Sequence, residues 1–534
     1  MIWLSRDTTK TLLAVHGWSG ILLGLLLYAV ICTGVAAVFA TEINNWASPL
    51  TRDATISLPA GVDRAVRDLA GQVDPQYHEE VAAWRGAGGR LIVFFHRHMQ
   101  DPEGRLNEYG VQFELHPETH EVLARREGWY DDIAAQSRPE GVAAFLVDLH
   151  VRLHIPEPWG LLVTGILGMA MMIAALTGLF AHRHLLKEMF TLRLAREALL
   201  RRRDLHVVAG TWNLPFAFIL AFTGSFFSFA TTLGLPLVAK ATFGGNEEAL
   251  IETLYGAPRE EKAEPAPLAD LDAMIADAAA RSGITSHFIG IERYGRADAT
   301  VWVYQPLPEN ELVYTSHLYD GTTGEYLTER PPLGQHPSLG ASLVGLMYPL
   351  HFGNFAGIAS KAAWVGLGFA GAYVTLTGLL LWTQRRIDQR AWQRMARLVH
   401  YVGYGLPLAL ACAPHAHFLF QDSTLSSGTL QGFAFIGAAA VAAIVSLTCD
   451  ELRRLRRILL TATAVAVLAL PFTRFAGGGP GWFEAWSSGL PGVAGVDITL
   501  LLVGASTLWL ARRRVTATHA ASLRPSLEAR TGSA

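Results

Sequence analysis

The chain has 534 residues, of which 51% are apolar and only 17% are charged. This composition indicates an integral membrane protein that is interrupted by polar insertions. The three cysteines (Cys32, Cys412 and Cys449) all lie in apolar runs without a pairing motif, which excludes a disulfide framework and a cysteine-ligated metal or iron–sulfur centre. The net charge of −3 says little about binding partners, because the basic residues are concentrated in particular loops. No nucleic acid is expected as a partner.

The first apolar stretch, Thr11–Ala40, is long enough to cross ~30 Å of hydrocarbon. A secretory signal peptide is the alternative, because Val38-Phe39-Ala40 resembles a cleavage site. The run is longer than a typical signal-peptide core, and it carries a histidine and glycine pattern that recurs later in the chain. We therefore expect an uncleaved first transmembrane helix.

Seven further apolar runs predict a total of eight spans. Three of them lie before the second basic loop, at Pro158–Ala181, His206–Leu233 and Ile358–Thr383. Four more lie at residues 398–420, 429–448, 458–472 and 494–511. Together with the first span, this pattern predicts an α-helical integral membrane protein.

Two polar insertions separate the first four spans, and each is expected to form its own small α+β domain. The first has a predicted helix at Val62–Leu69 and strands at Leu91–Phe95 and Val111–Leu115, followed by the turn His116–Thr119 and Val122–Ala124. The second repeats this plan with a helix at Leu268–Ala280, strands at Ala299–Tyr304 and Leu312–Leu318, and a tight turn at Tyr319–Glu325.

The expected division of the chain follows from these elements. It comprises the first span (1–41), the first insertion (42–149), the second span (150–182), a basic loop (183–204), the third span (205–235), the second insertion (236–340), the fourth span with an interfacial segment (341–384), a second basic loop (385–397), four additional spans (398–512) and a tail (513–534).

Lysine and arginine predict the orientation of these spans. They concentrate in the loops 183–203, 385–397 and 453–457 and at the start of the tail, whereas the short loops on the opposite side hold only Arg474. The basic loops are expected on the cytoplasmic side. Both termini would then be cytoplasmic, and both insertions would face the periplasm of a Gram-negative cell.

A histidine and glycine pattern repeats in the first four spans, with chain direction alternating. The members are His16 with Gly20 and Thr33-Gly34, His206 with Gly210 and Thr223-Gly224, His150 with Thr177-Gly178, and His351 with Thr377-Gly378. In the first and third spans, eighteen residues separate each histidine from the distant glycine, which is five helical turns or ~27 Å. The repeat predicts that two histidines meet at each membrane depth.

Two histidines meeting between helices are what a bis-histidine haem b requires. A porphyrin is flat and wide, so a helix that passes it must lack bulk there. Gly20, Gly210, Gly178 and Gly378 are expected to clear the inner depth, and Gly34 and Gly224 the outer depth. The pattern therefore predicts two haem b sites, one above the other, in a four-helix bundle with His16, His206, His150 and His351 as iron ligands.

Other interpretations remain open at this stage. Glycines also allow close helix packing in membranes, and histidines near helix ends also occur as interfacial residues. His154 competes with His150 because the two share a helical face. His182 and His184 are expected to be interfacial; His400, His415 and His417 belong to later spans, where no third haem is expected. His96-Arg97-His98 could contact a substrate, but a solvated strand is the preferred interpretation.

Several motifs carry a family resemblance. VHGWSGILLG, LHVRLHIPEPWG with LTGLF, and LHFGNFAG with LTGLLLW resemble motifs of the PepSY-associated transmembrane helix family of bacterial inner-membrane proteins. LHPETHEVL and LYDGTTGEYL resemble the closing turn and strand of PepSY modules, although His120 stands where the usual turn has glycine. The resemblance covers about residues 1–390 and leaves the four additional spans unassigned.

Characterised members of that family include dihaem ferric-siderophore reductases. The resemblance therefore implies an oxidoreductase with two haem b, with the same four histidines as axial ligands, and with a ferric siderophore or other ferric chelate as partner. No nicotinamide-binding motif follows a strand, so the electron donor is expected to be a separate cytoplasmic or membrane protein. The lipid bilayer is the other expected partner. The alternatives are a membrane electron conduit to a quinone or periplasmic oxidoreductase, and a haem-free protein whose PepSY-like modules bind a peptide or protease.

Overall fold

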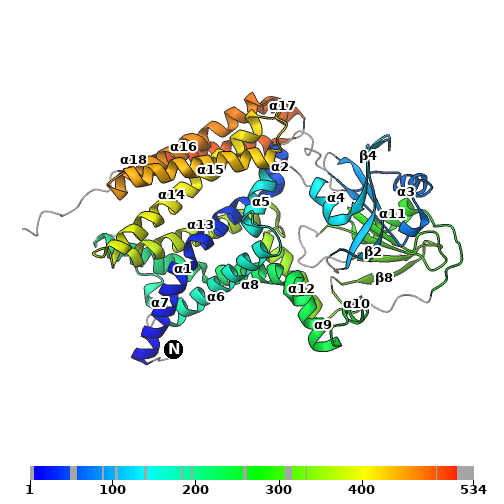
Figure 1. Cartoon of the computed structure of the whole chain (residues 1–534), viewed down its shortest axis with the longest axis horizontal. Helices are drawn as coiled ribbons and strands as arrows, with labels where there is room; N and C mark the ends of the chain where they lie inside the picture. Colours follow the sequence, from blue (N-terminus) through cyan, green and yellow to red (C-terminus); the bar gives the residue numbers. More distant parts are fainter. Residues whose placement is uncertain are drawn as a thin grey trace, which may run out of the picture.

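The computed structural model describes residues 5–47, 57–86, 89–102, 106–137, 141–181, 185–193, 197–255, 261–306, 316–331, 333–488 and 490–513. A bundle of long helices forms one part, and an antiparallel sheet with its own helices lies at one end of this bundle (Figure 1). His182 and His184 lie outside the described residues, as do residues 312–315 of the predicted strand in the second insertion.

Seven of the helices in the described ranges are long and apolar enough to cross a membrane. They are α1 (Arg6–Ala37), α6 (Trp159–Ala181), α8 (Ala198–Phe229), α13 (Gly357–Gln384), α15 (Ser427–Thr448), α16 (Leu452–Ala476) and α18 (Pro491–Arg512). The eighth predicted span falls in α14 (Arg390–Leu419), whose 30 residues reach ~45 Å but which is less apolar. It packs against α13, α15 and α16, so protein rather than lipid surrounds much of it.

Two short helices precede the second and fourth spans. They are α5 (Val142–Arg152) and α12 (Leu339–Phe352), with 11 and 14 residues, too short to cross ~30 Å of hydrocarbon. Gly353 ends α12 with a φ of 66°, a conformation that glycine adopts at little cost. The first insertion therefore ends earlier than predicted, because residues 142–149 belong to the same helix as His150.

The two insertions form one sheet and not the two separate domains that were predicted. The strands are β1 (Glu80–Arg85), β2 (Leu91–Gln100), β3 (Leu106–Leu115), β4 (Val122–Trp129), β5 (Phe288–Glu292), β6 (Thr300–Tyr304), β7 (Ser316–Asp320) and β8 (Tyr326–Arg330). Their order is β4-β3-β2-β1-β5-β6-β7-β8, so β1 pairs with β5 in the middle. This pairing removes an exposed strand edge from each half, which two separate domains would leave open.

Helices α3 (Val62–Ala70) and α11 (Leu271–Ser282) cover one face of this sheet with a shared core. The inward residues alternate along the strands, as Val81 and Ala83 do on β1 and Ile289 and Ile291 on β5. On the opposite face lie the intervening residues and α4 (Tyr130–Ser137). Figure 1 shows α4 on the side of the sheet toward the helical bundle.

Each of these two helices caps the other. The Asp272 carboxylate of α11 accepts hydrogen bonds from the backbone N–H groups of Gly61, Val62 and Asp63 at 3.1–3.3 Å. The Asp63 carboxylate in turn accepts from the N–H of Leu271 at 3.2 Å. Helix N-termini have unsatisfied N–H groups, so each half of the sheet domain supplies what the other half lacks.

The remaining elements complete the chain between these parts. They are α2 (Ala40–Ala47), η2 (Pro75–Tyr77), α7 (Leu185–Glu188), the π-helical turn η4 (Ala230–Gly234), α9 (Leu235–Phe243), α10 (Glu247–Tyr255) and α17 (Trp482–Ser487). His120 has a φ of 56° in the turn between β3 and β4, and Gly324 has a φ of 73° in the matching turn before β8. Histidine thus takes the left-handed conformation that glycine takes in the second half.

The C-terminal helices hold α2 through a buried ion pair. Arg474 of α16 and Asp497 of α18 are 2% and 0% exposed, and their side chains meet at 2.7 Å. The indole N–H groups of Trp46 and Trp482 donate to the same carboxylate at 2.7 and 2.8 Å. A buried charge is costly unless it is fully paired, and here four side chains satisfy one another.

Replacing Asp272 by alanine should loosen the sheet domain, because three N–H groups at the start of α3 lose their acceptor. Loss of a helix cap costs about 0.5–2 kcal/mol. Amide hydrogen exchange in α3 should therefore accelerate several-fold, while exchange in α13 stays unchanged. Asp68→Ala is the matched control, since its carboxylate lies exposed on the same helix with only Arg64 beside it at 3.5 Å. Equal acceleration in both variants would contradict the capping role.

Candidate functional site

The four repeated histidines form two pairs inside the bundle. The first pair consists of His16 on α1 and His206 on α8, with ring centroids 6.4 Å apart and planes at 73°. The second pair consists of His150 on α5 and His351 on α12, with centroids 6.1 Å apart and planes at 32°. The first pair lies toward the basic loops, and the second lies at the end of the bundle that carries the sheet.

Each imidazole is anchored through Nδ1 to a neighbouring helix. The acceptors are the Ala174 carbonyl for His16 (2.9 Å), the Val374 carbonyl for His206 (3.0 Å), the Val30 carbonyl for His150 (2.8 Å) and the Thr223 hydroxyl for His351 (2.9 Å). A carbonyl can only accept, so Nδ1 carries the proton. The Thr223 hydroxyl already donates to the Ile219 carbonyl at 2.8 Å, so it too accepts from the ring.

The glycine of each Thr-Gly pair makes room for one of these rings. A Cβ added at Gly34 would lie 2.8 Å from Cε1 of His150, and one at Gly224 would lie 3.2 Å from Cε1 of His351. At the first pair, the same holds for Gly178 beside His16 (3.2 Å) and Gly378 beside His206 (3.1 Å). The glycines lie at the predicted depths, and an imidazole ring lies beside each of them.

Gly20 and Gly210 differ from these four glycines. A Cβ at Gly20 would meet nothing within 4 Å, and one at Gly210 would make an ordinary contact of 3.6 Å with Val374. Each follows a histidine of the first pair by one helical turn, on the same face. Clearance for a flat ligand was predicted at both positions; Gly20 faces open space, whereas Gly210 lies at ordinary contact distance from Val374.

The spacing of both pairs fits one iron between two imidazoles. A metal–nitrogen bond is about 2.0–2.1 Å, and Nε2 lies about 1.1 Å from the ring centroid, so two rings that share one iron would have centroids about 6.2–6.4 Å apart. Protonation at Nδ1 leaves the lone pair on Nε2, the nitrogen that histidine would offer to such an iron. Both the spacing and the tautomer therefore suit bis-histidine ligation.

The other histidines of the bundle have different surroundings. His154 lies 2.6 Å from the Asp148 carboxylate and packs on Phe145, so of the two competing residues it is His150 that faces His351. Nδ1 of His400 donates to its own helix at the Ala396 carbonyl. His415 and His417 bond to Thr473 and Ser427. Over the described residues, no group of three or more His, Cys, Asp or Glu side chains is placed to hold a metal ion by itself.

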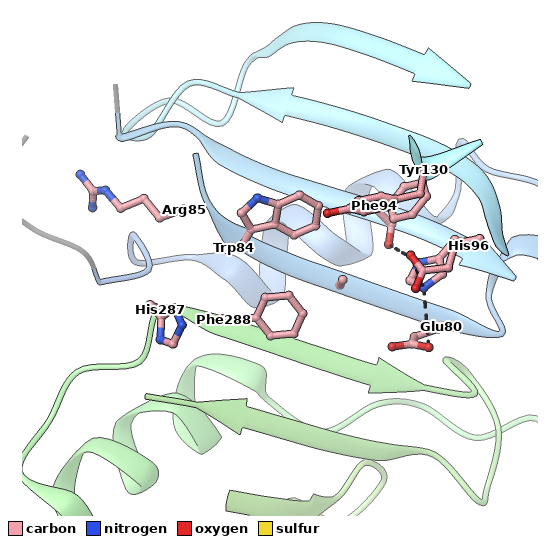
Figure 2. A pocket seen from close by; sticks show the side chains of 10 residues that line it. Glu80, Trp84, Arg85, Phe94, His96, Tyr130, His287 and Phe288 are labelled. Atoms are coloured by element: carbon pink, nitrogen blue, oxygen red, sulfur yellow. Dashed lines mark hydrogen bonds and ion pairs between the residues drawn. The ribbon is translucent and has the colours of Figure 1, made fainter. Parts of the chain in front are cut away.

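A second site lies on the open face of the sheet, where a solvated strand was predicted in preference to a substrate contact. His96 is 2% exposed and lines a cavity of about 410 Å³ with Glu80, Trp84, Phe94 and other residues (Figure 2). Its neighbour His98 is half-exposed, with 39% of its side chain accessible. His96 and His98 lie on the same face of β2, so strand alternation does not predict that only His96 is buried.

The electrostatics of this second site are set by carboxylates around the buried ring. Nε2 of His96 lies 3.6 Å from Glu80 and 3.8 Å from Glu108. Burial lowers the pKa of His96, but the two carboxylates outweigh it, so the pKa is raised above its ordinary value. Burial alone would raise the pKa of Glu80, yet His96 beside it brings that pKa below its ordinary value.

Comparisons with known proteins agree with the order of these elements. The model of the PepSY-associated TM region matches residues 13–385, which include both histidine pairs and the whole sheet. The uncharacterised protein PA4219 of Pseudomonas aeruginosa is 27% identical over 376 residues, which cover 67% of this chain and 92% of that relative. The four C-terminal helices follow the matched region. The chain is therefore a multi-pass membrane protein that belongs to the PepSY-associated transmembrane family.

Proposed function

We propose that this protein binds two haem b groups, one in each histidine pair, and carries electrons across the membrane to a ferric chelate on the side of the sheet. The observation that carries the proposal is the centroid separation of 6.4 and 6.1 Å in the two pairs, against the ~6.3 Å that one iron would require. Haem, when bound, supplies one-electron redox chemistry that no side chain of this chain provides.

The residues of this chain hold and orient the ligating nitrogens. Hydrogen bonds at Nδ1 fix the ring tautomer and raise the basicity of Nε2. The Thr-Gly positions keep each ring against its neighbouring helix. The two pairs lie about five turns apart along α1, because His16 of α1 belongs to the first pair and Gly34 of α1 contacts His150 of the second.

Sidedness follows from the basic loops, which favour the cytoplasm. We therefore place both termini and the first pair toward the cytoplasm of the bacterial inner membrane, and the sheet and the second pair on the periplasmic side. A separate cytoplasmic or membrane protein would donate the electrons. Reduction of Fe(III) to Fe(II) would release iron from a hard-oxygen chelate such as a siderophore, because the lower charge attracts oxygen ligands less.

The first prediction concerns haem content. Purified protein should carry about two haem b per chain, both six-coordinate and low-spin, since each iron would have two histidines. A pyridine haemochrome assay and the visible spectrum measure this directly. Protein that folds without any haem would instead favour the peptide-binding or protease-binding alternative.

Each histidine should serve only its own pair. His16→Ala or His206→Ala should remove the haem of the first pair and spare that of the second, whereas His150→Ala or His351→Ala should do the reverse. His154→Ala is the matched control, because its ring faces Asp148 and not the second pair. Redox-titrated spectra separate the two sites, and the same spectral loss in all four variants would contradict the pairing.

The glycines beside the imidazole rings allow a test in which no histidine is replaced. Gly224→Leu should disturb the second haem although α8 carries a ligand of the first, because a side chain at position 224 pushes on the ring of His351. Gly366→Leu is the control, since a Cβ there meets nothing within 4 Å. A normal second-site spectrum in folded Gly224→Leu protein would show that the glycine serves helix packing only.

The last prediction of this proposal concerns the order of the two sites. Reduced protein in oriented proteoliposomes should be reoxidised by a membrane-impermeant ferric chelate added on the side of the sheet. His351→Ala protein that keeps its first haem should lose most of this activity, because the second site lies between the first and the chelate. Reoxidation of that variant by the chelate at the wild-type rate would contradict electron transfer from the first site through the second. A panel with quinone and other oxidants tests the conduit alternative.

A further inference from the structure

The cavity on the open face of the sheet is built where the two halves of the domain meet. It lies over β1, β2 and β5, and Figure 2 shows its residues arranged along these strands. Trp84 and Phe288 stack across the β1–β5 junction with centroids 6.1 Å apart and planes at 18°. Phe94 stacks on His96 at 4.5 Å and 10°. These rings give the cavity flat apolar walls.

One end of the cavity gathers hydrogen-bond acceptors. Nδ1 of His96 lies 3.4 Å from the Phe94 carbonyl, which makes Nδ1 the donor and leaves Nε2 as an acceptor in the neutral ring. Nε2 is buried and has no hydrogen-bond partner among the described residues, because Glu80 and Glu108 lie at 3.6 and 3.8 Å, beyond hydrogen-bond distance. An unpartnered buried nitrogen is costly, and a donor placed among these three groups would remove that cost.

A primary ammonium group meets this requirement. It offers three N–H donors and one positive charge, and the site offers one imidazole nitrogen and two carboxylates as acceptors. The same carboxylates disfavour an anion, and a neutral hydroxyl would satisfy at most part of the set. A volume of about 410 Å³ lies within the range of small-ligand sites, ~300–1,000 Å³.

We propose that this cavity binds a small organic cation, a primary ammonium carried on a flat apolar or aromatic body. The ammonium lies among His96, Glu80 and Glu108, and the body lies along Trp84, Phe94 and Phe288. The site uses none of the four paired histidines, so its occupancy can be measured whether or not haem is bound. Tyr130, the first residue of α4, lines the cavity, and α4 lies on the side of the sheet toward the helical bundle (Figure 1).

The affinity should depend on pH in a defined direction. His96 is faced by Glu80 on β1, Glu108 on β3, His98 on its own strand and Tyr130 on α4. The carboxylates raise the pKa of His96. A proton on Nε2 occupies the position of the ammonium and repels it, so binding weakens as pH falls through this pKa and strengthens above it. The pKa of Glu80 is lowered, so its carboxylate stays charged in this range.

The test uses the full-length protein in detergent and three probes of nearly equal size: phenethylammonium, 2-phenylethanol and 3-phenylpropionate. Calorimetric titration should give phenethylammonium a Kd at least about tenfold below that of the alcohol. The carboxylate should not bind. Raising the pH from acidic to mildly alkaline should tighten binding of phenethylammonium and leave that of the alcohol unchanged. Equal affinity for the alcohol or the carboxylate, or no binding of phenethylammonium at millimolar concentration, would overturn the proposal.

Variants locate the site. Glu80→Gln and Glu108→Gln keep the side-chain shape and should each raise the Kd of phenethylammonium about tenfold, because each removes a charged acceptor. Glu121→Gln is the control, since this exposed residue lies outside the cavity. An equal effect of all three variants would contradict the site. If a glutamine variant does not fold, the probe series and its pH dependence on wild-type protein decide alone.

Discussion

Each of the four paired imidazole rings packs against a neighbouring helix, and the rest of the bundle depends on this contact. The contact is made at a Thr-Gly pair whose glycine leaves space for the ring, while a carbonyl or hydroxyl nearby accepts from Nδ1. The threonine hydroxyl donates back to its own helix: Thr177 donates to the Ile173 carbonyl at 2.6 Å and also lies 3.2 Å from the Ala174 carbonyl, which accepts from His16. A side chain larger than glycine would push the ring away and turn Nε2 from its partner. Small residues in membrane helices usually let backbones approach, whereas here they let a polar ring lie at a defined position.

These contacts follow an internal two-fold pattern. Within the first half, the ring of His16 packs against α6 and the ring of His150 packs against α1. Within the second half, the ring of His206 packs against α13 and the ring of His351 packs against α8. Each ring then faces its equivalent from the other half. The sheet obeys the same rule, because β1 pairs with β5 and Asp63 and Asp272 cap each other's helices. The acceptor cluster around His96 departs from it, since β6 presents Trp302 and Tyr304 on the open face. A site at the junction can therefore differ between halves while the scaffold stays equivalent.

Sequence spacing predicted which histidines lie at the same depth, because in a helix the residue number translates directly into depth. His16 and Gly34 are five turns apart whatever else the chain does, so the pairing of depths could be derived without any tertiary contact. The side chain that lies beside each glycine could not be derived in this way, because it depends on how the helices rotate about their axes. Fusion of the two insertions was missed for a different reason. β1 and β5 are strands of six and five residues about 200 positions apart, and no local signal records their pairing. Burial of His96 was hidden in the same way, since the junction creates the cavity around it.

The helices beyond the matched family region support the two halves unequally. Phe145 of α5 packs on Phe435 of α15, and the Gln431 side chain donates to the Gly141 carbonyl at 3.2 Å, where α5 begins. Trp46 of α2 joins the same apolar cluster and donates to the Asp497 carboxylate. The helix that carries His150 is thus held from outside by α14, α15 and the ion pair of α16 and α18. Its counterpart α12, which carries His351, packs instead on α8. Because the two rings of the second pair belong to differently supported helices, a change in the C-terminal helices would move one ring relative to the other without touching either histidine.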